Sequence, residues 1–422
     1  MIHFTNARLI DPESLSDALG SLTIHDGRIE AVNTDPPESV EIIDCKGKCL
    51  APGIVDWGVK IGEPGERHKE SFRSAGLAAA AGGVTTIIAR PDTFPPLDDP
   101  EALEFVTRRA SDAPGNIRHM AALTKSREGR EMVEMGFLQD AGAVAFTDGV
   151  RPVADTRLLS RCMTYARGLN ALVVTHPQDV GLSRGAVATS GKFASLYGLS
   201  AVSPMAEVMG LDRDLALVAM TRTRWHADQI TVAASLPALR RAREAGLDVT
   251  AGISIHHLTL NEFDVGDYRT FFRFTPPLRS EDDRMAMVQA VADGVIDVIA
   301  SFHTPQDEES KRLPFAEAAP GAVGLQTLLP AAMRLYHQGG LSLPQLWRAM
   351  SLNPARRLGL EAGRLTAGAP ADLVLFDPDA PFVLDRFSLL SKSKNTPFDG
   401  SRMQGKILGT WVAGSRVFGE AR

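Results

Sequence analysis

Short apolar runs alternate with amphipathic helical segments through the middle of the chain. The predicted helices include residues 100–110, 155–169, 235–246 and 280–294, and several end at a glycine. The predicted strands lie at residues 54–57, 84–89, 117–123, 143–146, 171–175, near 224–232, around 249, and at 295–300. Eight strand–helix units over about 300 residues indicate an α/β fold, a (β/α)8 TIM-type barrel rather than an open doubly wound sheet.

Both ends of the chain have a different pattern, in which short strand-like runs are separated by turn residues. The N-terminal part contains Asp-Pro, Asp-Gly and Pro-Pro turns, and the tail has β-type runs at 371–377, 381–385 and 405–418. We therefore expect a small β-sandwich-like domain formed by residues 1–51 together with 360–422. The barrel, residues 52–359, is then inserted between its two halves.

Composition narrows the class of protein and its partners. The chain has 422 residues, is 44% hydrophobic and carries a net charge of −6 spread over mixed-sign positions, so we expect a globular protein with no nucleic-acid partner. No apolar run approaches the roughly 20 residues that span a bilayer, and the start of the chain does not resemble a secretion signal. We expect a cytoplasmic protein without a membrane partner. Cys45, Cys49 and Cys162 are expected to be reduced thiols.

Six sequence blocks occur in a characteristic order along nearly the whole chain. They read APGIVDWGVKIGEPG, AAAAGGVTTIIARPDTFPPLDDPE, GAVAFTDG, TPPLRSEDDR, GAVGLQTLLPA and GRLTAGAPADLVLFDP. Together they resemble the bacterial dihydroorotases of the amidohydrolase superfamily. The resemblance implies reversible hydrolysis of a cyclic amide by a metal-bound hydroxide, with a carboxylate that carries the proton.

The residues that would bind the metal and move the proton are replaced in this sequence. The family has two histidines spaced as H-x-H after the first strand, where this chain has Gly58 and Lys60. After the eighth strand the family has D-H-A-P-H, in which the aspartate is both ligand and base. Here Phe302 stands at the aspartate, His303 is retained, and Gln306 replaces the last histidine. A glycine and a phenyl ring offer no metal ligand, and an ammonium repels a divalent cation.

The substrate contacts that the resemblance implies are also changed, whereas some metal positions are retained. Gly62 replaces the arginine that grips the substrate carboxylate, and Asp92 replaces the asparagine of M-P-N-T. Asp148 in FTDG corresponds to a bridging ligand of one bacterial subgroup, and His176 corresponds to the strand-five histidine. Gln229 aligns with the strand-six histidine. The loss is therefore spread over several strand ends.

Two roles for the surviving polar residues stay open. In the first, they are vestigial and held by hydrogen bonds; His303 then has a scaffold role. In the second, a single zinc ion is bound by an unusual set, in which a small register shift brings in His226 beside Asp148, His176 and His303. We also hypothesise that the Lys60 ammonium occupies roughly the former metal position and pairs with Asp148.

Two further segments carry expectations about structure. His257, beside His256 in the loop after strand seven, is expected to be structural. The resemblance implies that SKSKNTP, residues 391–397, packs between the β domain and the barrel.

Two classes of function follow from the resemblance. One is a catalytically inactive dihydroorotase-like subunit, without catalytic residues, cofactor or metal, that acts as a scaffold for the aspartate transcarbamoylase catalytic chain in pyrimidine biosynthesis. The other is an active, divergent cyclic amidohydrolase with one zinc ion, or a related hydrolase of pterin, hydantoin or allantoin-type rings. Removing metal, base and substrate clamp each costs orders of magnitude in rate, which favours the inactive subunit. The resemblance also implies at least a homodimer.

Overall fold

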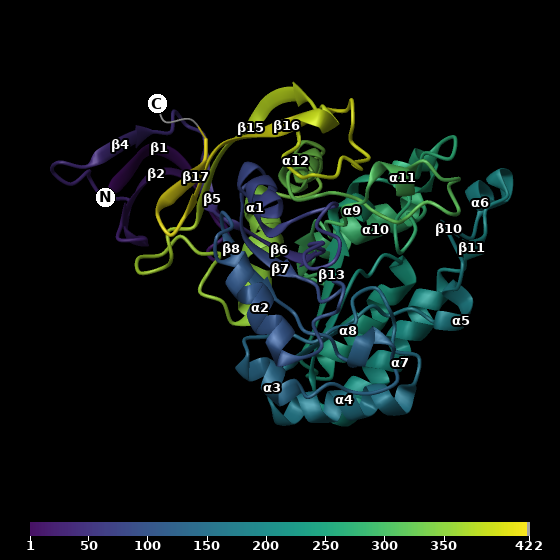
Figure 1. The fold of residues 1–422 in the computed structure, drawn as a ribbon. Helices are drawn as coiled ribbons and strands as arrows, with labels where there is room; N and C mark the ends of the chain where they lie inside the picture. The colour runs from purple at the N-terminus through teal and green to yellow at the C-terminus, as the bar shows by residue number, and fades with distance from the viewer. Residues whose placement is uncertain (420–422) are drawn as a thin grey trace.

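The computed structural model describes residues 1–419 and confirms the predicted fold class (Figure 1). Parallel strands form the barrel wall: β6 (Ile54–Val59), β7 (Val84–Ala89), β8 (Asn116–His119), β9 (Leu172–Thr175), β12 (Arg224–Ala227), β13 (Val249–Ser254) and β14 (Val298–Ala300). The main helices of the barrel region are α1 (Phe72–Ala81), α2 (Pro100–Ala110), α3 (Met135–Asp140), α4 (Thr156–Gly168), α7 (Met205–Thr221), α8 (Leu236–Glu244), α10 (Glu281–Ala292), α12 (Leu328–His337), α13 (Leu343–Trp347) and α14 (Asn353–Leu358).

Helix boundaries follow the capping signals in the sequence. Asp99 accepts a hydrogen bond from the backbone N–H of Ala102 at the start of α2, Pro100 has no N–H that would need an acceptor, and two arginines occupy the last turn. Ser280 caps α10 in the same way, and three acidic residues follow it in the first turn, where the helix dipole stabilises negative charge. The capping residues Asp99 and Ser280 therefore set where α2 and α10 begin.

The fourth wall segment differs from the predicted strand at 143–146. Only Phe146 forms bridges there, one to Ala121 and one to Val173. The segment nonetheless pairs with both of its neighbours. The Phe146 N–H donates to Leu172 O and its carbonyl accepts from Val174 N, both at 2.9 Å; on the other side Ala121 N donates to Ala145 O and Thr147 N donates to Ala121 O, both at 2.9 Å. The segment occupies the predicted place but is too short to be a regular strand, because the chain turns away at Gly149, where φ is +65°.

The barrel closes between β6 and β14 through a buried carboxylate. Asp56 accepts hydrogen bonds from the backbone N–H of Ser301, at 2.7 Å, and from its hydroxyl. The backbone N–H of Lys60 donates to His303 O at 2.8 Å. Burial raises the pKa of Asp56 to about 6, although the bonds from Ser301 oppose the rise. The first and last strands are thus joined just below the barrel mouth.

Apolar side chains fill the barrel interior. Alternate residues of one strand point to the same face, and the inner cluster contains alternating pairs such as Val55 and Trp57 of β6. Phe302, directly after β14, belongs to this cluster and is only 5% exposed. The barrel interior is therefore a packed apolar core.

Strands from both ends of the chain form a single eight-stranded sheet. They are β1 (Ile2–Asp11), β2 (Ser16–His25), β3 (Arg28–Val32), β4 (Glu41–Asp44), β5 (Cys49–Pro52), β15 (Leu373–Val383), β16 (Arg402–Val412) and β17 (Ser415–Phe418). Leu50 of β5 pairs with Leu9 of β1 on one side and with Leu375 of β15 on the other, so the two ends of the chain share one hydrogen-bonded sheet. We retain 1–51 with 360–422, and 52–359, as the proposed domain limits.

The sheet lies beside the barrel, and strands β15 and β16 extend from it above α12 (Figure 1). The loop between these strands returns to the barrel mouth. Asn395 donates to Thr304 O at 3.1 Å and accepts from the backbone N–H of Gln306 at 3.0 Å. Ser391 donates to the buried carboxylate of Glu70. The packing role expected for residues 391–397 is therefore confirmed.

A smaller excursion, α5 (Val180–Ser183), β10 (Ala188–Thr189), α6 (Lys192–Tyr197) and β11 (Ala201–Val202), projects from the barrel on the side away from the sheet (Figure 1). Short helices α9 (Ile255–Thr259) and α11 (Glu308–Lys311) follow β13 and β14. Within residues 1–419, no helix has the length and apolar character required to cross a membrane.

Candidate functional site

Gly58 and Phe302 are in contact at the carboxyl ends of β6 and β14. Gly58 has a φ of +71°, a conformation that favours glycine. A Cβ atom placed on it would lie 2.6 Å from Cε1 of the Phe302 ring. The phenyl ring therefore occupies the space into which any side chain at position 58 would project. Neither residue offers a metal ligand, and the Phe302 ring leaves no room for a histidine at position 58, the first position of the family's H-x-H pair.

Lys60 forms an ion pair with Glu66, which contradicts the predicted pairing with Asp148. Its Nζ lies 2.7 Å from Glu66 Oε2. Glu66 also pairs with Lys69, and although burial opposes its ionisation, these hydrogen bonds hold the pKa of Glu66 below its usual value. Lys60 pairs with Glu66 instead of Asp148, because the turn at residues 62–66 supplies a carboxylate close by along the chain.

The turn at residues 62–66 also excludes the substrate-gripping arginine. A Cβ on Gly62 would lie 2.4 Å from the backbone oxygen of Glu66. The backbone N–H of Glu66 donates to Gly62 O, which closes the turn. A side chain at position 62 would therefore require the backbone itself to move.

Asp148 is held by the backbone rather than by a cation. Its carboxylate accepts hydrogen bonds from the N–H groups of Leu123 and Thr124, both at 3.0 Å, and from the Thr124 hydroxyl at 2.5 Å. Burial raises its pKa, and these bonds oppose the rise. Arg127 donates to the backbone carbonyl of Asp148. The carboxylate thus orders the loop after β8, and the sequence prediction of a Lys60–Asp148 pair is wrong.

Asp92 is largely enclosed, and its charge is neutralised by a neighbour. Arg90 Nη2 lies 3.2 Å from Asp92 Oδ2 and also donates to the hydroxyl of Thr304. Although burial disfavours the anion, Arg90 and Lys60 hold the pKa of Asp92 below its usual value. The negative charge that replaces the family's asparagine is therefore already compensated within the chain.

His303 has the arrangement of a scaffold residue. Its Nδ1 accepts hydrogen bonds from the N–H groups of Gly324, at 3.0 Å, and Leu325. The proton must then be on Nε2, which lies 3.3 Å from Glu70 Oε2 and donates to it. Both side chains are fully buried. His303 connects the loop after β14 to Glu70, and through Glu70 to Ser391.

The other histidines near the mouth are buried and neutral. His226 lies against Trp57, with ring centroids 4.6 Å apart, and its Nδ1 is 2.8 Å from the Thr250 hydroxyl. Burial lowers the pKa of His226 well below its usual value and that of His176 to about 4. His257 Nε2 lies 3.0 Å from Pro276 O, in agreement with its expected structural role.

The residues present do not fit the metal ion that the resemblance implies. In the part of the chain that the structure describes, no three His, Cys, Asp or Glu side chains are grouped closely enough to hold a metal. The four-residue set of the second hypothesis, Asp148, His176, His226 and His303, is not brought together. Each of Asp148, His226 and His303 is instead committed to a hydrogen bond elsewhere.

A small cavity of about 140 Å³ with a mixed polar and apolar lining remains at the mouth. It is lined by Lys60, Arg90, Asp92, Val150, Gln229, Ser254, His256, Phe274, Thr275, Phe302, Thr304, Gln306, Pro320 and Gly321. Cavities that bind drug-sized ligands are typically about 300–1,000 Å³. Arg90 Nε, Asp92 Oδ1, His256 Nε2 and Gln306 Oε1 lack protein partners, so the cavity suits water or a very small polar molecule. It brings together five of the predicted vestigial positions: Lys60, Asp92, Gln229, Phe302 and Gln306.

Asp228 and Arg90 are site residues that sequence reasoning missed. Burial raises the pKa of Asp228 to about 7, Arg90 only partly opposes the rise, and Asp228 Oδ1 has no protein partner. Their positions in the sequence could have identified them, because Asp228 follows strand β12 directly and Arg90 follows strand β7 directly. Strand-end residues of a barrel are the first to inspect for chemistry.

Comparisons with known proteins agree with the sequence blocks. Residues 47–233 match the family model described as dihydro-orotase-like, and residues 320–418 match that of an amidohydrolase family. Proteins named dihydroorotase from Desulforapulum autotrophicum and Pelobacter propionicus are 36% and 37% identical to this chain. The first alignment covers 99% of both chains and the second covers 98% of both.

Solved structures support the fold. An L-hydantoinase (dihydropyrimidinase) from Arthrobacter aurescens superposes with a TM-score of 0.89 at 24% identity, covering 100% of this chain and 96% of the other. A dihydropyrimidinase from Brevibacillus agri gives 0.85 at 21% identity, covering 99% and 95%. At these identities the likeness concerns the fold alone.

A double-mutant cycle tests the contact between Gly58 and Phe302. Gly58→Ala should lower the free energy of unfolding by about 2–4 kcal/mol, because it adds a clash to the strain of a positive φ. In the Phe302→Ala background the same substitution should cost only about 1 kcal/mol. Gly246→Ala is the matched control, since Gly246 has a φ of +68° with open space around it. Urea unfolding measures all variants, and an equal cost of Gly58→Ala in both backgrounds would contradict the contact.

Asp228 should make stability depend on pH. Its pKa in the folded protein lies above the ordinary value of 3.8, so the folded state is destabilised as the group ionises between pH 3.8 and about 7. Asp228→Asn should therefore raise the free energy of unfolding at pH 8 by on the order of 1–3 kcal/mol and leave it unchanged near pH 4. Asp112→Asn, at an exposed position, is the control. A gain that is the same at both pH values would count against this role.

Proposed function

Because the chain belongs to the dihydroorotase family, we propose that it is a catalytically inactive member that acts as an assembly partner of aspartate transcarbamoylase in cytoplasmic pyrimidine biosynthesis. The observation that carries the proposal is the Phe302 ring packed against Gly58, in the space where the first metal-binding side chain would project. A homodimer or larger assembly of this chain is part of the proposal.

Cyclic amide hydrolysis requires a metal anchor, a base and a substrate clamp, and the residues that would supply these three functions are replaced in this chain. The metal anchor is replaced by Gly58 and by Lys60, which is paired with Glu66. The base is replaced by a phenyl ring at Phe302, and the turn at Gly62 has no room for a substrate clamp. Each loss alone is expected to lower the rate by orders of magnitude. The barrel is intact while its mouth is filled by side chains, which supports a structural role in an assembly rather than a catalytic one.

The names of the relatives favour a second candidate, an active cyclic amidohydrolase. Proteins named dihydroorotase align with this chain over 98–99% of its length. Asp228, with its pKa raised to about 7 by burial, has the proton affinity that suits a general base. It nevertheless has no nucleophile to activate, because the described histidines and carboxylates do not converge on a metal position. We therefore rank this candidate second.

Metal content and hydrolysis distinguish the two candidates. The purified protein should contain well under one zinc ion per chain and should show no hydrolysis of dihydroorotate, even after incubation with zinc. The Pelobacter propionicus dihydroorotase, purified and assayed in parallel, is the positive control. About one tightly bound zinc ion per chain, together with turnover of dihydroorotate, would overturn the proposal that the chain is inactive and would establish the second candidate.

Association with the transcarbamoylase tests the assembly role. The chain and the aspartate transcarbamoylase catalytic chain of the same organism should co-elute on size exclusion at micromolar concentrations, and mixing should raise transcarbamoylase activity. Lys60→Ala should assemble equally well, because the proposal gives the barrel mouth no part in binding. Separate elution with unchanged activity on mixing would contradict the partner, whatever the metal content.

A further inference from the structure

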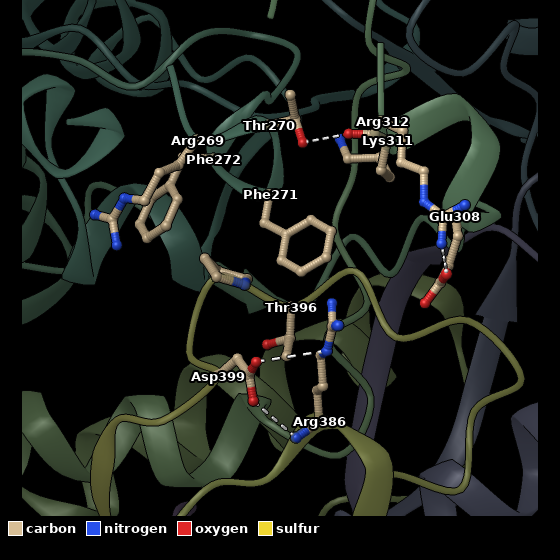
Figure 2. Close-up of a pocket in the computed structure, with 11 residues that line it drawn as sticks. Arg269, Thr270, Phe271, Phe272, Glu308, Lys311, Arg312, Arg386, Thr396 and Asp399 are labelled. Carbon is tan, nitrogen blue, oxygen red and sulfur yellow. Dashed lines mark hydrogen bonds and ion pairs between the residues drawn. The ribbon is translucent and has the colours of Figure 1, made fainter. Parts of the chain in front are cut away.

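A second, larger cavity of about 450 Å³ lies apart from the barrel-mouth cavity and shares none of its lining residues (Figure 2). Three stretches of chain form it: the short helix at 270–272, helix α11, and the β15–β16 loop around residues 386 and 396–399. Its volume falls within the range of about 300–1,000 Å³ that small-molecule sites occupy. The proposed function makes no use of it.

Cationic side chains outnumber carboxylates around this cavity. Arg269, Lys311, Arg312 and Arg386 line it, against Glu308 and Asp399. Arg312 pairs with Glu308 at 2.8 Å, and Arg386 Nε lies 3.5 Å from Asp399 Oδ2, as the close-up shows (Figure 2). Both carboxylates are thus already engaged. The guanidinium of Arg269 donates to the backbone oxygens of Asp264 and Val265 and is turned away from Phe271 (Figure 2), which leaves Lys311 as the cation at this cavity without a carboxylate partner among residues 1–419.

Lys311 is the most unusual of these cations. It is only 5% exposed, and its ammonium donates to the backbone oxygen of Ala319 at 2.5 Å. Across residues 1–419, no carboxylate oxygen forms an ion pair with it, and the neighbouring Arg273 adds repulsion. Burial and Arg273 together lower the pKa of Lys311 to about 7. A buried cation without a counter-ion is costly, and an anion in the adjacent cavity would offset that cost.

An aromatic ring supplies the apolar part of the cavity. The side chain of Phe271 stands in the middle of the lining residues in the close-up (Figure 2). The guanidinium of Arg386 lies 5.3 Å from the centre of this ring and 4.7 Å from that of Phe387. A flat group lying against Phe271 would place an attached anionic group within reach of the surrounding cations.

We propose that this cavity binds a small organic anion, in which a phosphate or carboxylate group is attached to a planar apolar part. The cations bind the anionic group, and Phe271 packs against the planar part. Since the lining comes from the barrel and from the C-terminal loop, the bound anion connects the two. This site is independent of the barrel mouth, so its test is also independent of the proposed function.

Titration calorimetry with phenyl phosphate as the probe tests the site. One equivalent should bind per chain, and more tightly than inorganic phosphate, which lacks the ring. Lys311→Met and Arg386→Gln should each weaken binding by about tenfold or more, because each removes a charge-assisted contact. Lys192→Met, at an exposed position on α6, should leave the dissociation constant unchanged. Lys311→Met keeps the side-chain volume, and Arg386 is partly exposed, so at least one variant is expected to fold.

Proton uptake gives a second readout. An anion stabilises the ammonium of Lys311, so binding at pH 8 should take up a fraction of one proton, measured from the heats in two buffers of different ionisation enthalpy. Glu308, Arg312, Arg273, Arg386 and Asp399 also face this region, and Lys311→Met should abolish the uptake while they remain. Absence of saturable binding up to about 10 mM phenyl phosphate, or equal affinity in all variants, would overturn the proposal. Equal affinity for the two probes would contradict the role of Phe271.

Discussion

The arrangement of the barrel mouth follows from the Phe302 ring, which occupies the space where a Cβ atom on Gly58 would project. The ring extends the apolar cluster of the barrel interior up to the strand ends. It can lie there only because position 58 has no side chain and adopts a positive φ. The ring would clash with the histidine that the family has at position 58. The two departures are therefore one structural change.

Around this contact the polar residues neutralise one another in pairs. Lys60 binds Glu66, Arg90 binds Asp92, and His303 donates to Glu70. Buried charges are tolerated when they are paired and hydrogen-bonded, and these pairs leave no group of ligands free for a metal. Asp228 is the exception, since its carboxyl is buried without a strong partner and its pKa is raised to about 7. Apart from Asp228, the charged side chains at the barrel mouth are therefore paired with one another.

The sequence predicted the barrel, the sheet made from both ends, and the spread of the changed positions, because strand periodicity and local motifs carry that information. It did not predict that Lys60 would bind Glu66, since that choice depends on how the turn from Gly62 to Glu66 closes. Buried carboxylates were missed for a related reason. Glu70 and Glu207 look like surface charges in the sequence, yet Glu207 accepts hydrogen bonds from the backbone of Thr231 and Val232 deep in the fold. Such partners come from distant segments.

Side-chain packing at the strand ends of the barrel leaves no metal site among the described residues. Anomalous diffraction at the zinc edge, from crystals of the full chain grown with excess zinc, tests this. We expect no anomalous peak among Gly58, Lys60, Asp148, His176 and Phe302, with the Phe302 ring in place against Gly58. A peak at the strand ends, with His176 and Asp148 turned toward it and the ring displaced, would show that the barrel mouth does hold a metal.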